Sequence, residues 1–341
     1  MRTAELIAPL TFRLGETPSE GPGPGEVQVR VGAVGICGSD LHAYGEGAVG
    51  GTPNVYPMVL GHEPAGTIVK TGPGVTGLAP GDRGALEPAL YCYHCEFCLG
   101  GHHNVCANLR FLSNPGCPGF FRELVNLPVA NFLPIPSGMS LDEATLVEPL
   151  AVAMHSLRLA SIRPGETVAV VGAGPIGLLT IAALRASAAR RIWAVEPVAH
   201  RRELARMVGA DVALEPAEAV EEILGGTDRR GVDCAIDCAA QEDTTGQAIE
   251  VARRAGRVVL TGIHSTPFVS MNASAMRRKE LTLFNVRRSN HESRPALELL
   301  EAHPDWFAPL LTHAREIDRI DEAFAIANAY GDGVGKMIVR P

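Results

Sequence analysis

The chain has 341 residues, of which 46% are hydrophobic, and a formal net charge of -8 at pH 7. This length exceeds one ordinary hydrophobic core and predicts two domains, while the acidic balance supplies no basic field for nucleic acid. No apolar run reaches the roughly 18 residues that a membrane span needs, and the first fifteen residues lack a signal-peptide pattern, so we expect a soluble, cytoplasmic protein with no membrane partner.

Glycine and proline break residues 26–147 into short β-like segments such as EVQVRVGAVG, AGTIVKTG and FFRELVNLP. Such segments predict an irregular, mostly β domain. Two of its turns carry side chains that can bind metal or move protons: Cys37, Ser39, Asp40 and His42 in GICGSDLH, and His62 and Glu63 in GHEPAG. Each also has a plain structural interpretation, as a small buried thiol or a polar turn residue.

Half of the eight cysteines lie in the segment CYHCEFCLGGHHNVC. They are Cys92, Cys95, Cys98 and Cys106, spaced as C-x2-C-x2-C-x7-C. Such spacing lets four thiolates close a tetrahedral zinc shell without an open position, which predicts structural rather than catalytic zinc. An iron–sulfur cluster can use similar spacing and is the alternative. His94, His102 and His103 are not needed for this shell, and we expect them on the loop surface.

The segment ATLVEPLAVAMHS adds Glu148 at the start of an expected helix and His155 seven residues later. A catalytic zinc needs three protein ligands and one open position. Cys37, His62 and one carboxylate would form a neutral shell around Zn²⁺, although none of them alone predicts a metal. His155 is expected to be a core or surface residue of the helix.

From residue 157 onward, apolar strands alternate with amphipathic helices. The expected strands are ETVAVVGAG, RRIWAVEP, GVDCAIDCA, RVVLTGI and KELTLFNV, and the expected helices are PIGLLTIAALRAS, AHRRELARMVGA and TTGQAIEVARRAG. The alternation predicts βαβ units and a parallel sheet with helices on both faces. After about Arg287, RPALELLEAH is expected to form a helix and GVGKMIVRP a closing strand that returns to the first domain.

A G-x-G-x-x-G motif lies between the first of these strands and the following helix. Its residues are Gly172, Ala173, Gly174, Pro175, Ile176 and Gly177. The glycines permit a tight turn, close approach of a pyrophosphate and packing of helix on strand. Glu196 ends the next strand, where a carboxylate can bind a ribose hydroxyl and favours NAD over NADP. Arg201 or Arg202 could pair with a 2′-phosphate, so NADP is the alternative cofactor. The alternative to a nucleotide site is a glycine-rich turn that binds no nucleotide.

The chain resembles the zinc-dependent medium-chain alcohol and polyol dehydrogenases over nearly its whole length. The resemblance rests on five motifs in the order found in that family: C-G-S-D-x-H, G-H-E-x-x-G, the four-cysteine segment 92–106 (here called the cysteine lobe), V-E-P-L and G-x-G-x-x-G. The resemblance implies an α/β protein with a GroES-like, mostly β catalytic domain over residues 1–150 and 288–341. It implies a doubly wound Rossmann NAD-binding domain over residues 151–287. It also implies two zinc ions per chain, one catalytic and one structural, and a homo-oligomer, dimer or tetramer, formed through the edge of the dinucleotide-domain sheet.

The same resemblance implies roles for individual residues. Cys37, His62 and Glu148 correspond to catalytic zinc ligands, Glu63 to a glutamate that binds the metal directly or through water, Ser39 and His42 to a proton relay, and Asp40 to a partner that orients His62. Glu148 stands where many simple alcohol dehydrogenases have a second cysteine, which shifts the expected substrate towards polyols, sugar alcohols, sugar acids or hydroxy amino acids. Arg287 or Arg288 lies near the position of a substrate-binding arginine in polyol members, with a solvated surface arginine as the alternative.

The function implied by the resemblance is hydride transfer from a secondary alcohol of a polyol, sugar alcohol or sugar acid to NAD, giving the ketone. An L-threonine 3-dehydrogenase-like enzyme and a simple secondary alcohol dehydrogenase are the enzymatic alternatives. A cofactor-binding protein without turnover is disfavoured by the complete set of site residues. Ala43 replaces an aromatic residue frequent in sorbitol dehydrogenases, and ANLRFLSNPGCPGFF matches no substrate loop that we can assign, so the exact sugar stays open.

Overall fold

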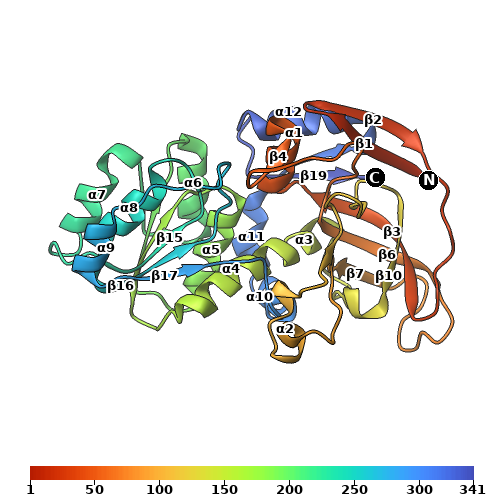
Figure 1. The fold of residues 1–341 in the computed structure, drawn as a ribbon, viewed down its shortest axis with the longest axis horizontal. Helices are drawn as coiled ribbons and strands as arrows, with labels where there is room; N and C mark the ends of the chain where they lie inside the picture. Colours follow the sequence, from red (N-terminus) through yellow and green to blue (C-terminus); the bar gives the residue numbers. More distant parts are fainter. The chain divides into compact units, whose positions relative to one another are not determined.

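The computed structural model describes residues 1–341 and divides into two compact units (Figure 1). The first unit comprises Met1–Pro149, Ser293–Ala302 and Leu311–Pro341. The second unit comprises Leu150–Glu292 and His303–Leu310. The expected domain boundary at residues 287 and 288 therefore differs from the observed division, because the second unit continues to Glu292 and includes a further short segment.

The first unit is built on a seven-stranded sheet with the order β11-β7-β6-β3-β19-β18, and β10 pairs with β3 outside this path. The strands are β3 (Glu26–Gly35), β6 (Glu63–Thr71), β7 (Arg83–Leu86), β10 (Leu124–Pro128), β11 (Phe132–Pro134), β18 (Leu311–Glu316) and β19 (Lys336–Arg340). Strand β19 runs antiparallel to β3, with Val339 opposite Val34. The closing strand of the chain thus completes the first unit.

The other elements of the first unit are short strands and helices. They are β1 (Arg2–Ala8), β2 (Thr11–Glu16), α1 (Gly38–Glu46), β4 (Ala48–Val49), β5 (Thr52–Pro53), β8 (Ala89–Leu90), α2 (Glu96–Leu99), β9 (Arg110–Phe111), α3 (Leu141–Ala144), α10 (Ser293–Ala302) and α12 (Ile320–Asn328). Phe324 of α12 packs on Phe12 and Tyr44 with ring centroids 4.8 and 5.0 Å away. This aromatic cluster joins α1, β2 and α12 to one core.

The second unit contains a six-stranded sheet in which every pairing is parallel, with the order β14-β13-β12-β15-β16-β17. Its strands are β12 (Thr167–Val171), β13 (Arg191–Val195), β14 (Val212–Leu214), β15 (Val232–Asp237), β16 (Ala252–Leu260) and β17 (Thr282–Asn285). This is the 3-2-1-4-5-6 order of doubly wound dinucleotide-binding sheets. The predicted α/β class is confirmed.

Helices lie between the parallel strands along the chain, and α11 follows the last of them (Figure 1). They are α5 (Pro175–Ala186), α6 (Ala199–Val208), α7 (Pro216–Gly225), α8 (Thr244–Val251), α9 (Ala273–Lys279) and α11 (Pro304–Phe307). Helix α4 (Val147–Ala160) precedes β12, and the division between the units falls within it. No helix is both long enough and apolar enough to cross a membrane.

Helix α8 is shorter than the pattern TTGQAIEVARRAG predicted, because it ends at Val251 and strand β16 already begins at Ala252. The pairing of β15 with β16 is irregular between Val232 and Cys234. Arg253 leaves the expected helix and directs its guanidinium to Asp233, with Nε 2.7 Å from Oδ1. A tertiary ion pair therefore overrides the local helical pattern.

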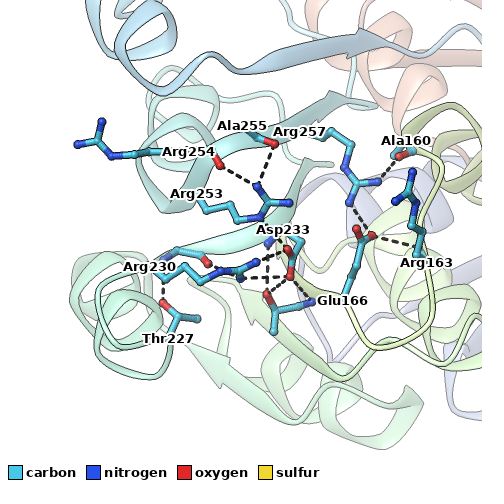
Figure 2. A network of polar contacts seen from close by, with 12 residues as sticks. Ala160, Arg163, Glu166, Thr227, Arg230, Asp233, Arg253, Arg254, Ala255 and Arg257 are labelled. Carbon is cyan, nitrogen blue, oxygen red and sulfur yellow. Dashed lines mark hydrogen bonds and ion pairs between the residues drawn. The ribbon is translucent and has the colours of Figure 1, made fainter.

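Asp233 is the centre of a polar network at the amino end of the sheet (Figure 2). Its carboxylate accepts hydrogen bonds from Arg230 at 2.6 Å, Arg253 at 2.7 Å and the Thr167 hydroxyl at 2.8 Å. Burial alone would raise the pKa of Asp233, but Arg230, Thr167 and Arg253 outweigh it and hold that pKa well below its ordinary value. The carboxylate thus ties the starts of β12, β15 and β16 together.

Replacing Asp233 with alanine should lower the free energy of unfolding by about 2 kcal/mol, because Arg253 and Thr167 lose a charged partner in a largely buried place. Urea denaturation measures this loss. The matched control is Glu221→Ala, whose ion pair with Arg229 is exposed and whose loss should change stability by less than about 0.5 kcal/mol. Equal losses of stability in the two variants would contradict the stabilising role of the Asp233 carboxylate.

Candidate active site

A buried carboxylate joins the two loops that carry the expected zinc ligands. Asp40 lies in the first turn of α1, where its Oδ2 accepts a hydrogen bond from the Cys37 backbone N–H at 3.1 Å. Its Oδ1 accepts from the Gly61 backbone N–H at 3.2 Å and from the Ser113 hydroxyl at 3.4 Å. The loop before α1 and the loop before β6 are thereby held side by side.

Gly61 has to be a glycine at this place. Its φ of +88° lies in the left-handed region, and a Cβ there would meet Val34 at 3.0 Å and Phe121 at 3.1 Å. A larger residue would combine backbone strain with a steric clash. The turn therefore directs the next residue, His62, towards Asp40 and Cys37.

The ring of His62 is oriented from both of its nitrogens. Nδ1 lies 3.3 Å from Asp40 Oδ1, and Nε2 lies 3.3 Å from Ser39 Oγ. The Phe111 ring packs nearby, with centroids 5.4 Å apart. A carboxylate on Nδ1 is the common second partner of a metal-bound imidazole, so Nε2 is the nitrogen that would bind a metal.

The charges of this cluster depend on one another. Burial alone would lower the pKa of His62, but Asp40 and the Cys37 thiol, which lies within hydrogen-bonding reach, raise that pKa well above its ordinary value. Burial alone would raise the pKa of Asp40, but His62 and the N–H groups of Cys37 and Gly61 keep it below its ordinary value. The surroundings of His62 thus favour a positive charge, as expected at a metal site.

Glu148 begins helix α4 and brings a second carboxyl group to the cluster. Burial raises the pKa of Glu148 to about 8, and the charges of Glu63 and Glu87 act in the same direction. His62 and Lys336 act in the opposite direction without compensating the burial. The structure thus brings Glu148, His62 and Glu63 within electrostatic reach of one another, and a divalent cation would favour the ionised form of Glu148.

Glu63 forms a buried ion pair with Lys336, and only 1% of each side chain is exposed. Lys336 Nζ also donates a hydrogen bond to the Ile36 carbonyl oxygen at 2.9 Å. The pair fits only because residue 35 is glycine, since a Cβ at Gly35 would lie 2.3 Å from Glu63 Oε2 and 2.7 Å from Lys336 Cε. Both Glu63 and Glu148 are thus near His62, but Glu63 already has its own counterion.

The two residues of the expected proton relay lie on helix α1. Ser39 Oγ contacts His62 Nε2, at the position where a metal ion would bind. The imidazole of His42 is half-buried and its Nδ1 lies 2.7 Å from Glu46 Oε1, one turn further along the helix. Ser39 therefore faces His62, and His42 contacts the exposed carboxylate of Glu46.

The four cysteines of the lobe converge on one point. Their ligand atoms all lie within 4.8 Å of one another, with Sγ–Sγ distances of 3.5 Å for Cys92–Cys106, 3.9 Å for Cys95–Cys106 and 4.0 Å for Cys92–Cys98. Four zinc–sulfur bonds of about 2.3 Å in a tetrahedron place the sulfurs about 3.8 Å apart. An iron–sulfur cluster would hold them farther apart, because several atoms lie between its thiolates. The geometry fits a single tetrahedral zinc ion.

The glycine-rich loop of the second unit connects β12 to α5 as the motif predicted. Gly172 has φ +92° and a Cβ there would meet Ala239 at 2.7 Å, while a Cβ at Gly177 would lie 1.9 Å from the Gly172 carbonyl oxygen. Gly174 precedes the helix, which begins at Pro175. The loop therefore has the tight turn and the exposed helix N-terminus that a pyrophosphate requires.

Glu196 and the two arginines lie beside this loop. Glu196 is buried at the end of β13 and accepts hydrogen bonds from the Ala173 N–H at 2.8 Å and the Val198 N–H at 3.0 Å. Arg202 pairs with Glu215 at 2.6 Å and donates to the Glu196 carbonyl oxygen at 2.9 Å. Arg201 is the arginine beside Gly174, with Nη1 3.9 Å from the position of a Cβ on that residue.

Lys336 and Ser113 are the residues of this site that sequence reasoning missed. The only signal for Lys336 is a lysine in an otherwise apolar closing strand, KMIVR, whose first four residues are all buried. Ser113 has φ +98°, which the sequence does not reveal. His155, expected in a core or on a helix surface, is buried and contacts Glu292.

Comparisons with known proteins agree with this architecture. Residues 23–137 match the alcohol dehydrogenase GroES-like domain, and residues 175–302 match the zinc-binding dehydrogenase family. Sorbitol dehydrogenase of Bacillus subtilis is 32% identical over 318 residues, covering 93% of this chain and 90% of that protein. L-idonate 5-dehydrogenase of Vitis vinifera is 33% identical over 324 residues, covering 92% of this chain and 88% of that protein.

A solved structure shows the same fold over the whole chain. It is that of a putative zinc-binding dehydrogenase from Sinorhizobium meliloti bound to NADP, which has a TM-score of 0.91 and 30% sequence identity. The match covers 100% of this chain and 99% of that one.

Replacing Lys336 with methionine should lower the free energy of unfolding by about 3–5 kcal/mol, because Glu63 would be left as an unpaired buried charge. The double variant Lys336→Met/Glu63→Gln should lose less than the sum of its single variants. Urea denaturation of the metal-free proteins, followed by circular dichroism, measures the three losses. Additive losses would show that the two side chains do not stabilise each other.

The metal-free protein should lose stability as the pH rises from about 5 to about 9. The carboxyl group of Glu148 ionises near 4.5 when exposed, but its pKa in the folded protein is about 8, so its contribution is present below 4.5 and is lost as the pH rises through 8. Glu148→Gln, which cannot ionise, should flatten this dependence. Urea denaturation in the presence of a chelator gives both curves, and parallel curves would contradict the burial of this group.

Proposed function

Because the chain belongs to the zinc-binding alcohol dehydrogenase family, we propose that it transfers a hydride from a secondary alcohol of a polyol, sugar alcohol or sugar acid to NAD, giving the ketone. The observation that carries the proposal is the carboxyl group of Glu148 within electrostatic reach of His62, whose ring in turn lies within hydrogen-bonding reach of the Cys37 thiol. Glu148 stands at the place in the sequence where a cysteine would complete a simpler alcohol site. Relatives named sorbitol dehydrogenase and L-idonate 5-dehydrogenase support the substrate class.

Cys37, His62 and Glu148 would hold the catalytic zinc ion. A thiolate and a carboxylate balance the charge of Zn²⁺, and the neutral imidazole completes three protein ligands with one position left for the substrate. When bound, zinc lowers the pKa of a coordinated hydroxyl group, as it lowers that of water from 15.7 to about 7. The His62 ring would bind through Nε2, since Asp40 holds Nδ1.

Glu63 is assigned to a position beside the metal rather than to the permanent ligand set. Its charge is balanced by Lys336, whereas Glu148 has a raised pKa and gains most from a nearby cation. This arrangement leaves Glu148 as the carboxylate ligand. Glu63 can still accept a hydrogen bond from a water molecule at the open position.

Ser39 and His42 would remove the proton of the substrate hydroxyl. Ser39 Oγ is already 3.3 Å from the metal-facing nitrogen of His62, within reach of a group bound at the open position. Its hydroxyl can accept one proton while donating another, and the two ring nitrogens of His42 can pass a proton on. The contact of His42 with Glu46 supports an outward path.

The second unit would hold the dinucleotide. The loop from Gly172 to Gly177 would bind the pyrophosphate, and Glu196, which lies beside this loop, would accept a hydrogen bond from a ribose hydroxyl group, which favours NAD. Arg201 beside Gly174 and the NADP bound to the relative from Sinorhizobium meliloti keep NADP as the alternative. The cysteine lobe would hold a second, structural zinc ion, so that each chain contains two.

A cytoplasmic homo-oligomer, either a dimer or a tetramer, completes the proposal. All eight cysteines are free of disulfides, which suits a reducing compartment. Strand β17 is an edge strand of the parallel sheet and pairs on one side only, so a second copy can extend the sheet there. Light scattering of the purified protein reports the mass, and a monomer would refute this assignment.

The test is a substrate panel with sorbitol, xylitol, L-idonate, L-threonine and 2-propanol, each with NAD and with NADP, followed by absorbance of the reduced nicotinamide. A polyol or sugar acid should react with a kcat/KM at least about 100-fold above that of 2-propanol, because a site built for additional hydroxyl groups discriminates against analogues that lack them. The metal content should be two zinc ions per chain. L-threonine or 2-propanol as the best substrate would contradict the proposal.

Replacing Glu148 with alanine should remove one of the two zinc ions and lower kcat by at least about 100-fold, since the ligand set is incomplete. The affinity for NADH, measured by fluorescence titration, should change less than about twofold, because this residue belongs to the other unit. Full zinc content with normal turnover would exclude Glu148 from the ligand set.

A further inference from the structure

The parallel sheet reverses its strand order between β12 and β15, and a short turn follows β15 at this place. The chain adds β13 and β14 on one side of β12, and it adds β15, β16 and β17 on the other side. Ligands of doubly wound sheets bind outside the carboxyl ends of the strands at such a reversal. Residues 238–240, here called the β15 turn, come directly after the last residue of β15.

The β15 turn packs against the dinucleotide loop. A Cβ on Gly172 would lie 2.7 Å from Ala239 Cβ and 2.8 Å from the Ala239 backbone nitrogen. The Cys238 N–H donates to the Val171 carbonyl oxygen at 2.8 Å, immediately before the loop. Because protein interiors are closely packed, a displaced β15 turn would either displace the loop or leave it without support.

The β15 turn has a backbone conformation that its sequence alone does not favour. Ala240 is buried and has φ +51°, in the left-handed region. A Cβ on Gly262, which follows β16, would lie only 2.7 Å from Ala240 Cβ. A residue with a Cβ enters the left-handed region at a cost and persists there where its surroundings enforce it. The conformation of Ala240 therefore depends on contacts from neighbouring groups.

The carboxylate of Asp237, the last residue of β15, makes such contacts. Its Oδ1 accepts hydrogen bonds from the backbone N–H groups of Ala239 at 3.1 Å and Ala240 at 3.0 Å. Its Oδ2 accepts from the hydroxyl groups of Thr244 at 3.1 Å and Thr245 at 2.7 Å, at the start of α8. One carboxylate thus connects the β15 turn to the strand before it and to the helix after it.

These four hydrogen bonds leave Asp237 little capacity to bind a ligand itself. A carboxylate accepts at about four lone-pair sites, and two N–H groups and two hydroxyl groups already use them. The residue is also buried, with 1% of its surface exposed. Asp237 can therefore act on a bound dinucleotide through the β15 turn, without touching it.

We propose that Asp237 is a positioning residue for the cofactor, which keeps the β15 turn against Gly172 so that the dinucleotide loop retains its shape. The inference rests on the proposed function, because that function supplies the dinucleotide. Glu196 holds the same loop from β13, the other neighbour of β12, through the Ala173 N–H at 2.8 Å. The loop is thus supported from both neighbouring strands, and loss of Asp237 removes one of the two supports.

The experiment compares Asp237→Ala with a matched control, Asp233→Ala. Both aspartates are buried and belong to β15, but Asp233 lies at the amino end of the strand (Figure 2). Asp237→Ala should raise the Kd for NADH, measured by fluorescence titration, by about 10-fold, because a small displacement of a binding group has a large effect. KM for NAD should rise similarly, with kcat changed less than about threefold. The control should unfold at lower urea concentration and keep the Kd of the unmodified enzyme.

Two further variants test the route through the β15 turn. Asp237→Asn should recover most of the affinity for NADH, because its amide oxygen can accept from both N–H groups and its NH2 group can donate to the threonine hydroxyls. Thr245→Val removes the shortest hydrogen bond of the carboxylate and should raise the Kd by about threefold. It serves as the second variant if Asp237→Ala folds poorly. A Kd for Asp237→Asn as high as that for Asp237→Ala would overturn the inference.

Hydrogen exchange measures the turn itself, independently of activity. The amide protons of Ala239 and Ala240 should exchange faster in Asp237→Ala than in Asp233→Ala, because they lose their acceptor. Mass spectrometry of a peptide that covers the β15 turn gives both rates. Equal rates in the two variants would show that Asp237 does not hold the turn and would overturn the inference.

The outcomes also separate this inference from the proposed function. If the unmodified enzyme binds NADH and Asp237→Ala binds it equally well, the role of Asp237 is overturned and the proposed function stays intact. If the unmodified protein binds neither NADH nor NADPH, both are overturned. If Asp237→Ala and Asp233→Ala weaken NADH binding equally, the effect is a general loss of structure and the positioning role is overturned.

Discussion

The carboxylate of Asp40 is the constraint on which the candidate active site depends. It accepts hydrogen bonds from the backbone of the Cys37 loop and of the Gly61 loop, and it lies beside Nδ1 of His62. The expected thiolate and imidazole ligands come from segments more than twenty residues apart, and Asp40 contacts both segments and the ring. A buried, ionised Asp40 therefore holds the two expected ligands together and selects the His62 nitrogen that would face a metal ion.

Charge balance extends this constraint to the rest of the site. Two further carboxyl groups, Glu63 and Glu148, are close to His62, and the unit cannot bury both as unpaired anions. Lys336 neutralises Glu63 through a direct ion pair, and a protonated Glu148 avoids the second charge in the metal-free protein. A divalent cation beside Glu148 would stabilise its ionised form in place of a proton.

Sequence pattern predicted those features whose residues are close together or periodic. The cysteine lobe spans fifteen residues, the glycine-rich loop six, and the alternating strands and helices of the second unit follow local hydrophobic periods. The ion pair of Lys336 with Glu63 could not be predicted, because 273 residues separate the two and they meet only when β6 and β19 both pair with β3. The early end of α8 was missed for the same reason, since Arg253 leaves the helical pattern to reach Asp233. The individual ligand assignments stay predictions, founded on the resemblance and supported by the contacts of Asp40.

The place of Lys336 in the chain has a consequence for the order in which the protein matures. The cysteine lobe can gather its four thiolates as soon as Cys106 has been synthesised, because all of its ligands lie within one short segment. The cluster around His62 lacks the counterion of Glu63 until strand β19 has been made and has joined the sheet beside β3. The lobe is thus suited to assemble early, whereas the cluster around His62 reaches its final charge balance only after nearly the entire chain has been synthesised.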